Sequence, residues 1–350
     1  MLSRVADSIY WISRYVERAD HLARFIDVTR EFVLDVPTAK GQTPGKDQWS
    51  PLISVTGDEA LFYERYDTAD AASVTRFLTT DKLYLGSIVC SLDQARENAR
   101  SVRETIASEM WEQINSFYHW FHDESRGNGM MVREPGDFYR DIMQQCMLFQ
   151  GITDATMSRG LGWHFANLGR QLERADKIGR LLDVKYFTLL PKVQDVNTPL
   201  DNLQWSTLLR SVSGFEMYRK RYQEIDVRHV VDFLILDRLF PRSVQYCLFE
   251  AERSLHAITG CPLGAFSCKS EQLLGRLCAD LSYTEIDTII EGGLHEFIDD
   301  FQARLNQVGD AVFERFFAIA PTAEPKNELH DHSGDVPPDV MNQAHVQSNL

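Results

Sequence analysis

The sequence predicts an all-α fold, and three observations support this. Apolar side chains recur at the three- and four-residue spacing of a helix along almost the whole chain. No alternating apolar and polar run is long enough to indicate a β-strand. One helical unit also occurs twice within the 350 residues. We therefore expect a multi-helix bundle of two tandem, internally similar units, packed about a pseudo-two-fold axis.

The internal repeat is clearest in RYVERADHLARFID (residues 14–27) and RQLERADKIGRLLD (170–183), which are 156 residues apart. Seven matched positions are identical there, and six of the seven are charged. At the same offset, roughly 27 of about 140 aligned positions are identical without a gap, spread along the whole unit. Tandem duplication is the simplest account. It predicts a first unit over residues 1–160 and a second unit over 161–318.

The first helix is expected over residues 2–34, because Ser3 can cap it and no Pro or Gly occurs before Pro37. Breaker residues indicate loops at 37–48 and 126–137. Asp70 and Ser87 are typical N-cap residues. The further helices are expected at about 50–66, 70–80, 87–106, 109–122, 137–158, 163–189, 205–222, 226–237, 243–258, 270–281 and 284–317. Residues 319–350 are polar and lack aromatic side chains, which predicts a disordered tail.

The composition excludes several classes of partner. A net charge of −15 disfavours binding to nucleic acid or to an anionic membrane. We expect no signal peptide, because the first residues lack an apolar core, and no transmembrane helix, because no apolar run is long enough. The six cysteines contain no C-x-x-C pair and indicate reduced thiols in a cytoplasmic protein.

No metal or cofactor is expected. The spacing of Cys261, Cys268 and Cys278 suits zinc poorly, and His119 and His122 lie among aromatic residues that indicate ordinary packing. No nucleotide-phosphate loop and no nucleophile–base motif occurs in the sequence.

The repeated charges allow three interpretations. Pairs at i,i+3 and i,i+4 stabilise a solvated helix face by about 0.2–0.5 kcal/mol each, but such pairs do not require Arg rather than Lys. Strict identity of Arg and Glu is better explained by a buried ion-pair network between helices, or by a site that binds carboxylates through the planar guanidinium. The candidate binding residues in these stripes are Arg14, Arg18, Asp20, Arg24, Arg170, Arg174, Asp176 and Arg180.

Two further sets of candidates follow from the same helices. Glu17 or Glu173 could serve as a general acid or base if burial raised the carboxyl pKa, although adjacent arginines would lower it. The segment ARENARSVRE (95–104) offers Arg96, Asn98 and Arg100 as a second wall of an anion site, and its counterpart at 251–259 has lost most of these charges.

The opening MLSRVADSIYWISRYVERADHLARFIDV, the segment ARENAR and the segment FPRSVQYCL resemble the bacterial alpha-E domain family over about residues 1–318. The resemblance implies an all-helical protein whose Glu-Arg motif is Glu17-Arg18 and, in the repeat, Glu173-Arg174. Asp20 and Asp176 stand where this family commonly has Glu, with the charge kept. Members are typically encoded beside, or fused to, circularly permuted ATP-grasp proteins, often with transglutaminase-like proteins.

The resemblance therefore implies an accessory subunit of an ATP-grasp-dependent peptide or amide ligation system. Its expected partners are the ATP-grasp ligase-like protein, a transglutaminase-like protein, and an anionic peptide or small carboxylate presented by the Arg/Glu stripes. One alternative is an all-helical amide hydrolase or transferase that uses Glu17 or Glu173. The other is a scaffold whose stripes are structural ion pairs.

Overall fold

The computed structural model describes residues 1–35, 46–126, 134–189 and 199–318. Helix is the only regular secondary structure among these residues, which confirms the predicted all-α class. The predicted tail at 319–350 and most of the predicted loops at 37–48 and 126–137 lie outside the described residues. None of the helices in the described ranges is both long enough and apolar enough to cross a membrane.

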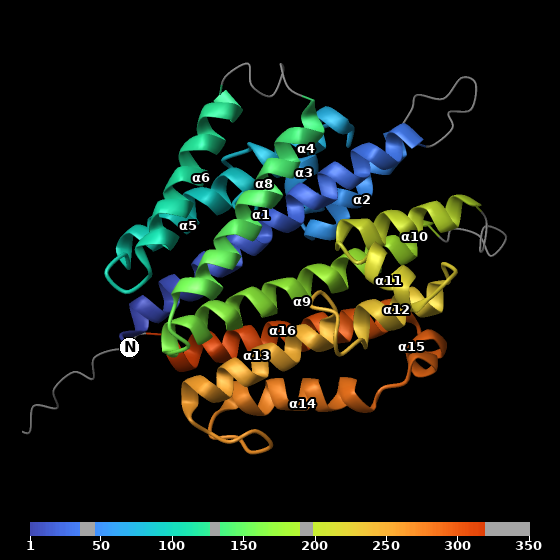
Figure 1. Ribbon diagram of the computed structural model, residues 1–350. Coiled ribbons are helices and arrows are strands. Elements are labelled where there is room, and N and C mark those ends of the chain that lie inside the picture. Colours follow the sequence, from blue (N-terminus) through green and yellow to red (C-terminus); the bar gives the residue numbers. More distant parts are fainter. Residues whose placement is uncertain (36–45, 127–133, 190–198, 319–350) are drawn as a thin grey trace, which may run out of the picture. The chain divides into compact units, whose positions relative to one another are not determined.

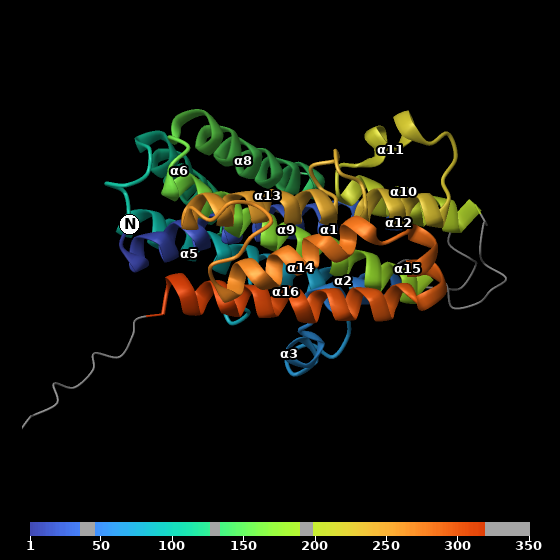
Figure 2. The same ribbon diagram turned by 90° about the horizontal axis from the view of Figure 1, so that it is seen from below.

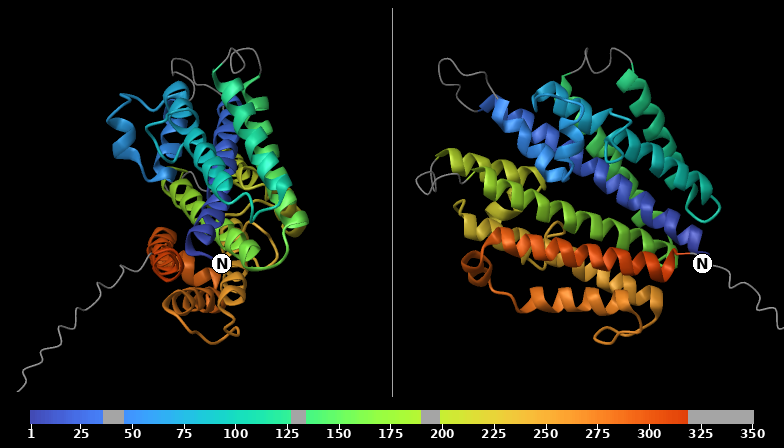
Figure 3. Two further views of the ribbon diagram at one scale, coloured as in Figure 1. Left: turned by 90° about the vertical axis from the view of Figure 1, so that its left-hand side faces the viewer. Right: turned by 180° about the vertical axis from the view of Figure 1, so that it is seen from behind.

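Two long helices form the centre of the fold, α1 (Ser3–Asp35) and α9 (Leu161–Leu189), which lie side by side (Figures 1 and 3). On the side of α1, the helices α5 (Ile88–Ser101) and α8 (Pro135–Thr156) pack against it, with α6 (Ser108–Arg126) outside them. On the side of α9, the covering helices are α13 (Val244–Thr259), α14 (Lys269–Tyr283) and α16 (Leu294–Phe316), which run side by side in Figure 2.

A shorter helix of each half also contacts the long central helix of the other half. Helix α2 (Lys46–Thr56) contacts α9, and α10 (Pro199–Ser211) contacts α1. Residues 1–318 consequently form one compact unit. The boundary between residues 160 and 161 stays a prediction from the repeat, because the halves are packed together through their central helices.

Several helices begin at positions related by the offset of the repeat. Helix α4 (Ala71–Thr79) and α12 (Val227–Ile235) start and end 156 residues apart. Their N-cap residues, Asp70 and Asp226, both accept a bond from the backbone N–H three residues later, at 2.9 and 3.0 Å. Such caps satisfy amide groups that have no partner within the helix, which fixes where each helix begins. Duplication remains our interpretation of these coincidences.

Three of the predicted helices are wrong because each is two helices. The span 50–66 divides into α2 and α3 (Glu59–Tyr63) at Gly57, where φ is +77°. The span 205–222 divides into α10 and α11 (Phe215–Arg221) near Ser213, where φ is +54°. The span 284–317 divides into α15 (Ile286–Gly292) and α16 at Gly293, where φ is +95°. A left-handed residue cannot continue a right-handed helix, so the chain turns at each point.

The charged face of α1 is buried as fully as its apolar face. Ala19 and Ile26 are 0% exposed on one side, and Glu17 and Asp20 are 0% exposed on the other. The interpretation of this stripe as a solvated surface is therefore wrong. The reason is topological, because α5, α8, α9 and α10 all contact α1 and leave it little access to water.

Candidate functional site

The two Glu-Arg motifs pair with each other across the α1–α9 contact. Glu17 accepts from Nε and Nη2 of Arg174 at 2.6 and 2.8 Å. Glu173 accepts from Nε and Nη2 of Arg18 at 2.7 and 3.2 Å. Each glutamate thus binds the arginine of the other motif through a planar, two-bonded contact, the geometry that distinguishes Arg from Lys. This reciprocity is what a pseudo-two-fold axis between the helices would produce.

The Glu17 cluster, which we define as Glu17 and Asp20 with their partners, is closed. Gln150 on α8 donates to Glu17 at 2.8 Å, and His21 is 3.0 Å from the same carboxylate. Arg242, in the turn before α13, reaches Glu17 at 3.4 Å and Asp20 at 2.8 Å. Arg24 also donates to Asp20, at 2.9 Å. Both carboxylates are 0% exposed, so this cluster is a buried ion-pair network.

Electrostatics keep Glu17 ionised. Burial alone would raise the pKa of its carboxyl, but the charges of Arg174 and Arg242 outweigh burial and hold that pKa well below its ordinary value. Burial also lowers the pKa of His21, so its imidazole is neutral near pH 7. A carboxylate with such a low pKa has no proton to donate near pH 7 and is a weak base.

The Glu173 cluster, Glu173 and Asp176 with their partners, has its acids at the matching positions but a partly different set of cations. Arg14 donates to Glu173 at 2.7 Å, in addition to Arg18. Lys177 Nζ lies 3.1 Å from Asp176 and 3.9 Å from Glu173. Although burial would raise the pKa of Glu173, Arg18 and Arg14 hold it well below its ordinary value, so this carboxylate is ionised as well.

The two clusters differ through a pair of exchanges at positions related by the repeat. Gly86 stands where the second half has Arg242, and Lys177 stands where the first half has His21. Lys177 contacts both acids of its cluster, as Arg242 does in the other. One positive charge is therefore supplied from α9 itself in the Glu173 cluster, and the space beside Gly86 is left without an arginine.

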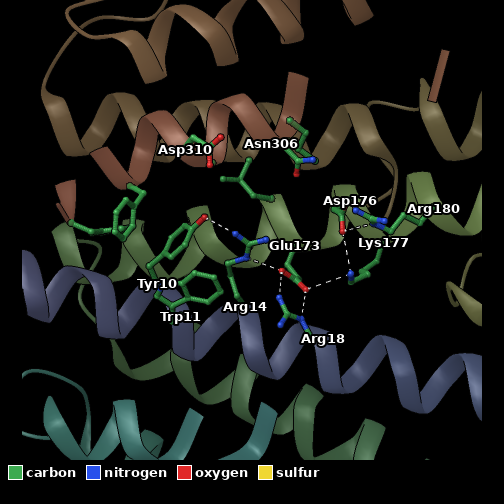
Figure 4. A pocket seen from close by; sticks show the side chains of 15 residues that line it. Tyr10, Trp11, Arg14, Arg18, Glu173, Asp176, Lys177, Arg180, Asn306 and Asp310 are labelled. Carbon is green, nitrogen blue, oxygen red and sulfur yellow. Dashed lines mark hydrogen bonds and ion pairs between the residues drawn. The ribbon is translucent and has the colours of Figure 1, made fainter. Parts of the chain in front are cut away.

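The Glu173 cluster borders two cavities of about 440 Å³ each. The α16 cavity lies among α1, α9 and α16 (Figure 4), and its lining residues are Tyr10, Trp11, Arg14, Arg18, Leu172, Glu173, Asp176, Lys177, Arg180, Leu305, Asn306, Gly309, Asp310, Phe313 and Phe317. The α2 cavity lies beside α1 and α2, and its lining residues are Arg18, Leu22, Phe25, Val55, Thr56, Asp58, Leu61, Leu83, Tyr84, Leu85, Gly86 and Lys177. Arg18 and Lys177 line both.

The Glu17 side holds a closed counterpart of the α16 cavity, with a volume of only about 10 Å³. Eight of its ten lining positions are those of the α16 cavity displaced by 156 residues. One contribution comes from the helix that closes each cavity: α8 has larger side chains than α16 at three matched positions, which are Phe149 against Leu305, Gln150 against Asn306, and Thr153 against Gly309.

The closed cavity also differs from the open one in an arginine–aspartate ion pair. Arg170 and Asp154 lie 3.4 Å apart in the closed one, where Arg170 also donates to Asn167 at 2.7 Å. Their counterparts, Arg14 and Asp310, both line the open α16 cavity. In Figure 4 Asp310 and Asn306 project from α16, on the side opposite Arg18.

The structure brings some predicted site residues together and leaves others apart. Arg14, Arg18, Asp176 and Arg180 line the α16 cavity, whereas Asp20, Arg24 and Arg174 belong to the closed Glu17 cluster. The predicted second wall is not part of either large cavity. On α5, Arg96 binds Asn115 and Glu97, Arg100 binds Glu97, and the carbonyl of Asn98 accepts from Ser101.

The metal candidates of the sequence have ordinary partners. His122 is paired with Asp93 at 2.7 Å. Among the described residues, one trio of potential ligands comes close together, His256, Cys261 and Glu271, within 4.8 Å. Glu271 is already used as the cap of α14, where it accepts from Ser267 and Cys268 and lies against Thr259. All six cysteines are free thiols, four of them buried.

Sequence reasoning missed Arg242, Lys177 and the lining residues on α16. Arg242 lies in FPRSVQYCL, a segment that carried the family resemblance without a role. The repeat held a usable signal, because some of the positions where its two copies differ lie in the clusters and cavities that distinguish the two sides. Mismatches such as Gly86 against Arg242 were therefore as informative as the matches.

Comparison with known proteins agrees with these motifs. A family model, described as a predicted alpha-helical domain with a conserved ER motif and named Alpha-E, matches residues 1–317. Uncharacterized proteins of Mycobacterium bovis and Mycobacterium tuberculosis are 22% identical over 343 residues, covering 92% of this chain and 38% of theirs. No solved structure gives a significant match. The chain belongs to the Alpha-E family.

Proposed function

We propose that this protein binds the carboxylate of an amino acid or peptide in the α16 cavity, as the accessory subunit of an ATP-grasp-dependent peptide or amide ligation system. One observation carries the binding proposal. The same cavity occurs twice, closed to about 10 Å³ beside Glu17 and open to about 440 Å³ beside Glu173. The open volume is within the range of about 300–1,000 Å³ that is usual for small-molecule sites.

The charges of the open cavity suit a ligand with a carboxylate at one end and an amine at the other. Arg14, Arg18, Lys177 and Arg180 line it together with three acids, Glu173, Asp176 and Asp310, so four cations against three anions leave one positive charge in excess. The excess lies on α1 and α9, while Asp310 is on α16. A guanidinium has five N–H donors, and Glu173 accepts from two nitrogens of Arg18, so the arginine can bind a second carboxylate.

The glycine on α16 supports a functional origin for the open volume. Gly309 lies inside a 23-residue helix, and a Cβ added there would meet no atom within 4 Å. Glycine in a helix interior lowers stability by roughly 0.5–1 kcal/mol relative to alanine. Space for a larger side chain is therefore present beside Gly309. At the matched position on α8, the larger side chain of Thr153 is found instead.

The role in ligation rests on the family resemblance and on the architecture of the relatives. Most of the length of the mycobacterial proteins lies outside the segment that this chain matches. We propose that a circularly permuted ATP-grasp protein supplies the nucleotide chemistry, in the cytoplasm, where ATP is available. The sequence of this chain has no phosphate-binding loop of its own. A transglutaminase-like protein would be a second partner of the same system.

The geometry disfavours the catalytic alternative and suits the scaffold alternative on one side only. Catalysis by Glu17 or Glu173 is disfavoured, because arginines hold both carboxyl pKa values well below their ordinary range. The scaffold alternative describes the Glu17 cluster, whose acids are fully buried and whose neighbouring cavity is closed. It does not explain the open volume on the Glu173 side.

Titration calorimetry with triglycine and with its C-terminal amide tests the binding proposal. Triglycine should bind, and the amide should bind at least about tenfold more weakly, because it cannot form charge-assisted bonds to the arginines. Arg14→Gln should weaken triglycine binding by about tenfold. Arg170→Gln, the matched change beside the closed cavity, should leave binding unchanged. Equal affinities for the acid and the amide, or equal effects of the two variants, would contradict the proposal.

The partnership needs a separate measurement. Affinity purification of the tagged protein from its native host, followed by mass spectrometry, should recover an ATP-grasp protein in stoichiometric amounts. A variant with Glu173→Gln serves as a parallel sample. If the folded wild-type protein recovers no ATP-grasp protein, the accessory-subunit role fails, while the carboxylate site is tested independently by the calorimetry.

A further inference from the structure

The α2 cavity lies on the other side of Arg18, an arginine that can bind the carboxylate in the proposal above. Arg18 and Lys177 line both this cavity and the α16 cavity. The remaining lining is mainly apolar, and its members come from α1, α2, α3 and the turn before α5: Leu22, Phe25, Val55, Leu61, Leu83, Tyr84 and Leu85. Arg18 and Lys177 thus stand where the two cavities meet.

The origin of the α2 cavity is visible at Gly86. On the matched side, Arg242 extends its side chain into the corresponding place and binds Glu17 and Asp20. Gly86 has no side chain, and a Cβ there would lie 2.5 Å from the ring of Tyr84. Tyr84 stacks on Phe77 at 4.1 Å and bonds to Asp58 at 2.9 Å, so its ring is held in that position. The glycine and the fixed tyrosine together keep the place of the arginine empty.

Two leucines at the rim of the cavity are exposed. Leu83 is 73% exposed and Leu85 is 76% exposed, although both border a volume of about 440 Å³. Leucine side chains at the mouth of an apolar cavity gain stability only when something covers them. The charged neighbours Arg18 and Lys177 indicate that the covering group is joined to an anion.

We propose that the two cavities are halves of one groove, and that its ligand is the C-terminal end of a peptide with an apolar last residue. This rests on the proposed function, and it adds the specificity. The terminal carboxylate accepts from N–H groups of Arg18 that do not bond to Glu173 and lies near Lys177, the last side chain enters the α2 cavity, and the preceding residues follow the α16 cavity toward Asp310. A peptide terminus fits because its carboxylate and last side chain branch from one carbon atom.

The test compares two peptides, N-acetylglycylglycine and N-acetylglycylleucine, by titration calorimetry. Burial of the leucine side chain should make the second peptide bind about tenfold or more tightly than the first. Leu61→Trp fills the α2 cavity and should reduce this preference to less than about threefold without weakening the glycine peptide. Met217→Trp, at the matched position of the other half, is the control and should keep the full preference.

The outcomes separate this inference from the function on which it rests. If both peptides bind with equal affinity, or if Leu61→Trp weakens both peptides equally, the inference is overturned and the carboxylate site stands. If neither peptide binds to the wild-type protein although triglycine does, the inference is overturned and the carboxylate site stands; if triglycine does not bind either, both proposals fail. Leu85→Ser is the second variant, because its side chain is largely exposed and its loss should not impair folding. It should lower the preference for the leucine peptide, and an unchanged preference would count against the inference.

Discussion

Replacement of either glutamate by glutamine gives a direct comparison of the closed and open sides. Glu17→Gln removes the charge that Arg174 and Arg242 face in a cluster closed to solvent. Glu173→Gln removes the matching charge, but from a cluster beside two open cavities. The two substitutions are chemically identical and occupy equivalent helical positions, so any difference in stability reports the surroundings.

The exposure of the arginines sets the expected magnitudes. In the Glu17 cluster the side chains of Arg174 and Arg242 are 7% and 11% exposed. Loss of the Glu17 charge therefore leaves these two positive charges nearly buried and without that partner. Breaking a buried pair from one side costs about 3–5 kcal/mol. In the Glu173 cluster, Arg14 and Arg18 are 21% and 20% exposed and border the cavities, where water can solvate them. The loss should be about 1.5–3 kcal/mol, the range for a hydrogen bond to a charged group.

Urea unfolding followed by circular dichroism measures both losses, and thermal unfolding checks them at about 2 °C per kcal/mol. We expect Glu17→Gln to destabilise the protein more than Glu173→Gln, with unchanged slopes of the unfolding free energy against urea. Equal losses for the two variants would refute the assignment of one side to structure and the other to binding. A greater loss for Glu173→Gln would reverse it.

Three further predictions follow from the same residues. Arg242→Ala should destabilise the protein by about 3 kcal/mol or more, and adding His21→Lys should restore part of this loss in urea unfolding, because lysine fills that role in the other cluster. Gly309→Ala should raise stability by about 0.5–1 kcal/mol, as should the control Gly151→Ala, but only Gly309→Ala should weaken triglycine binding in calorimetry. Acid should destabilise the protein: the folded-state pKa of both motif glutamates is lowered, so their contribution is present above about pH 4.3 and is lost as the pH falls through the folded values. The slope of unfolding free energy against pH below about 4 should therefore be smaller in Glu173→Gln than in the wild type, by up to about 1.4 kcal/mol per pH unit.

The fold class could be predicted from the sequence because helical periodicity is a local property. The ends of α4 and α12 were close to the expected ones, since Asp70 and Asp226 act as caps through neighbouring backbone groups. The breaks at Gly57 and Gly293 were missed, because a glycine inside a helical pattern shows its left-handed conformation only in the structure.

The candidate site could be predicted only in part. The repeated arginines and glutamates indicated paired guanidinium and carboxylate groups, and the pairs exist. Their partners could not be assigned, because i,i+4 spacing suggested contacts within each helix, whereas Glu17 and Glu173 bind arginines about 155 residues away. The open volume depends on differences in side-chain size on α8 and α16, which become meaningful only when the two helices are seen at equivalent places.

We propose that the Glu173 side binds a ligand and that the Glu17 side is structural. A crystal structure of the full chain grown with N-acetylglycylleucine would examine both sides at once. We expect the peptide carboxylate against Arg18 and near Lys177, the leucine side chain in the α2 cavity, and no ligand beside Glu17. A peptide bound elsewhere on the chain, or crystals in which both large cavities hold only water, would contradict this proposal.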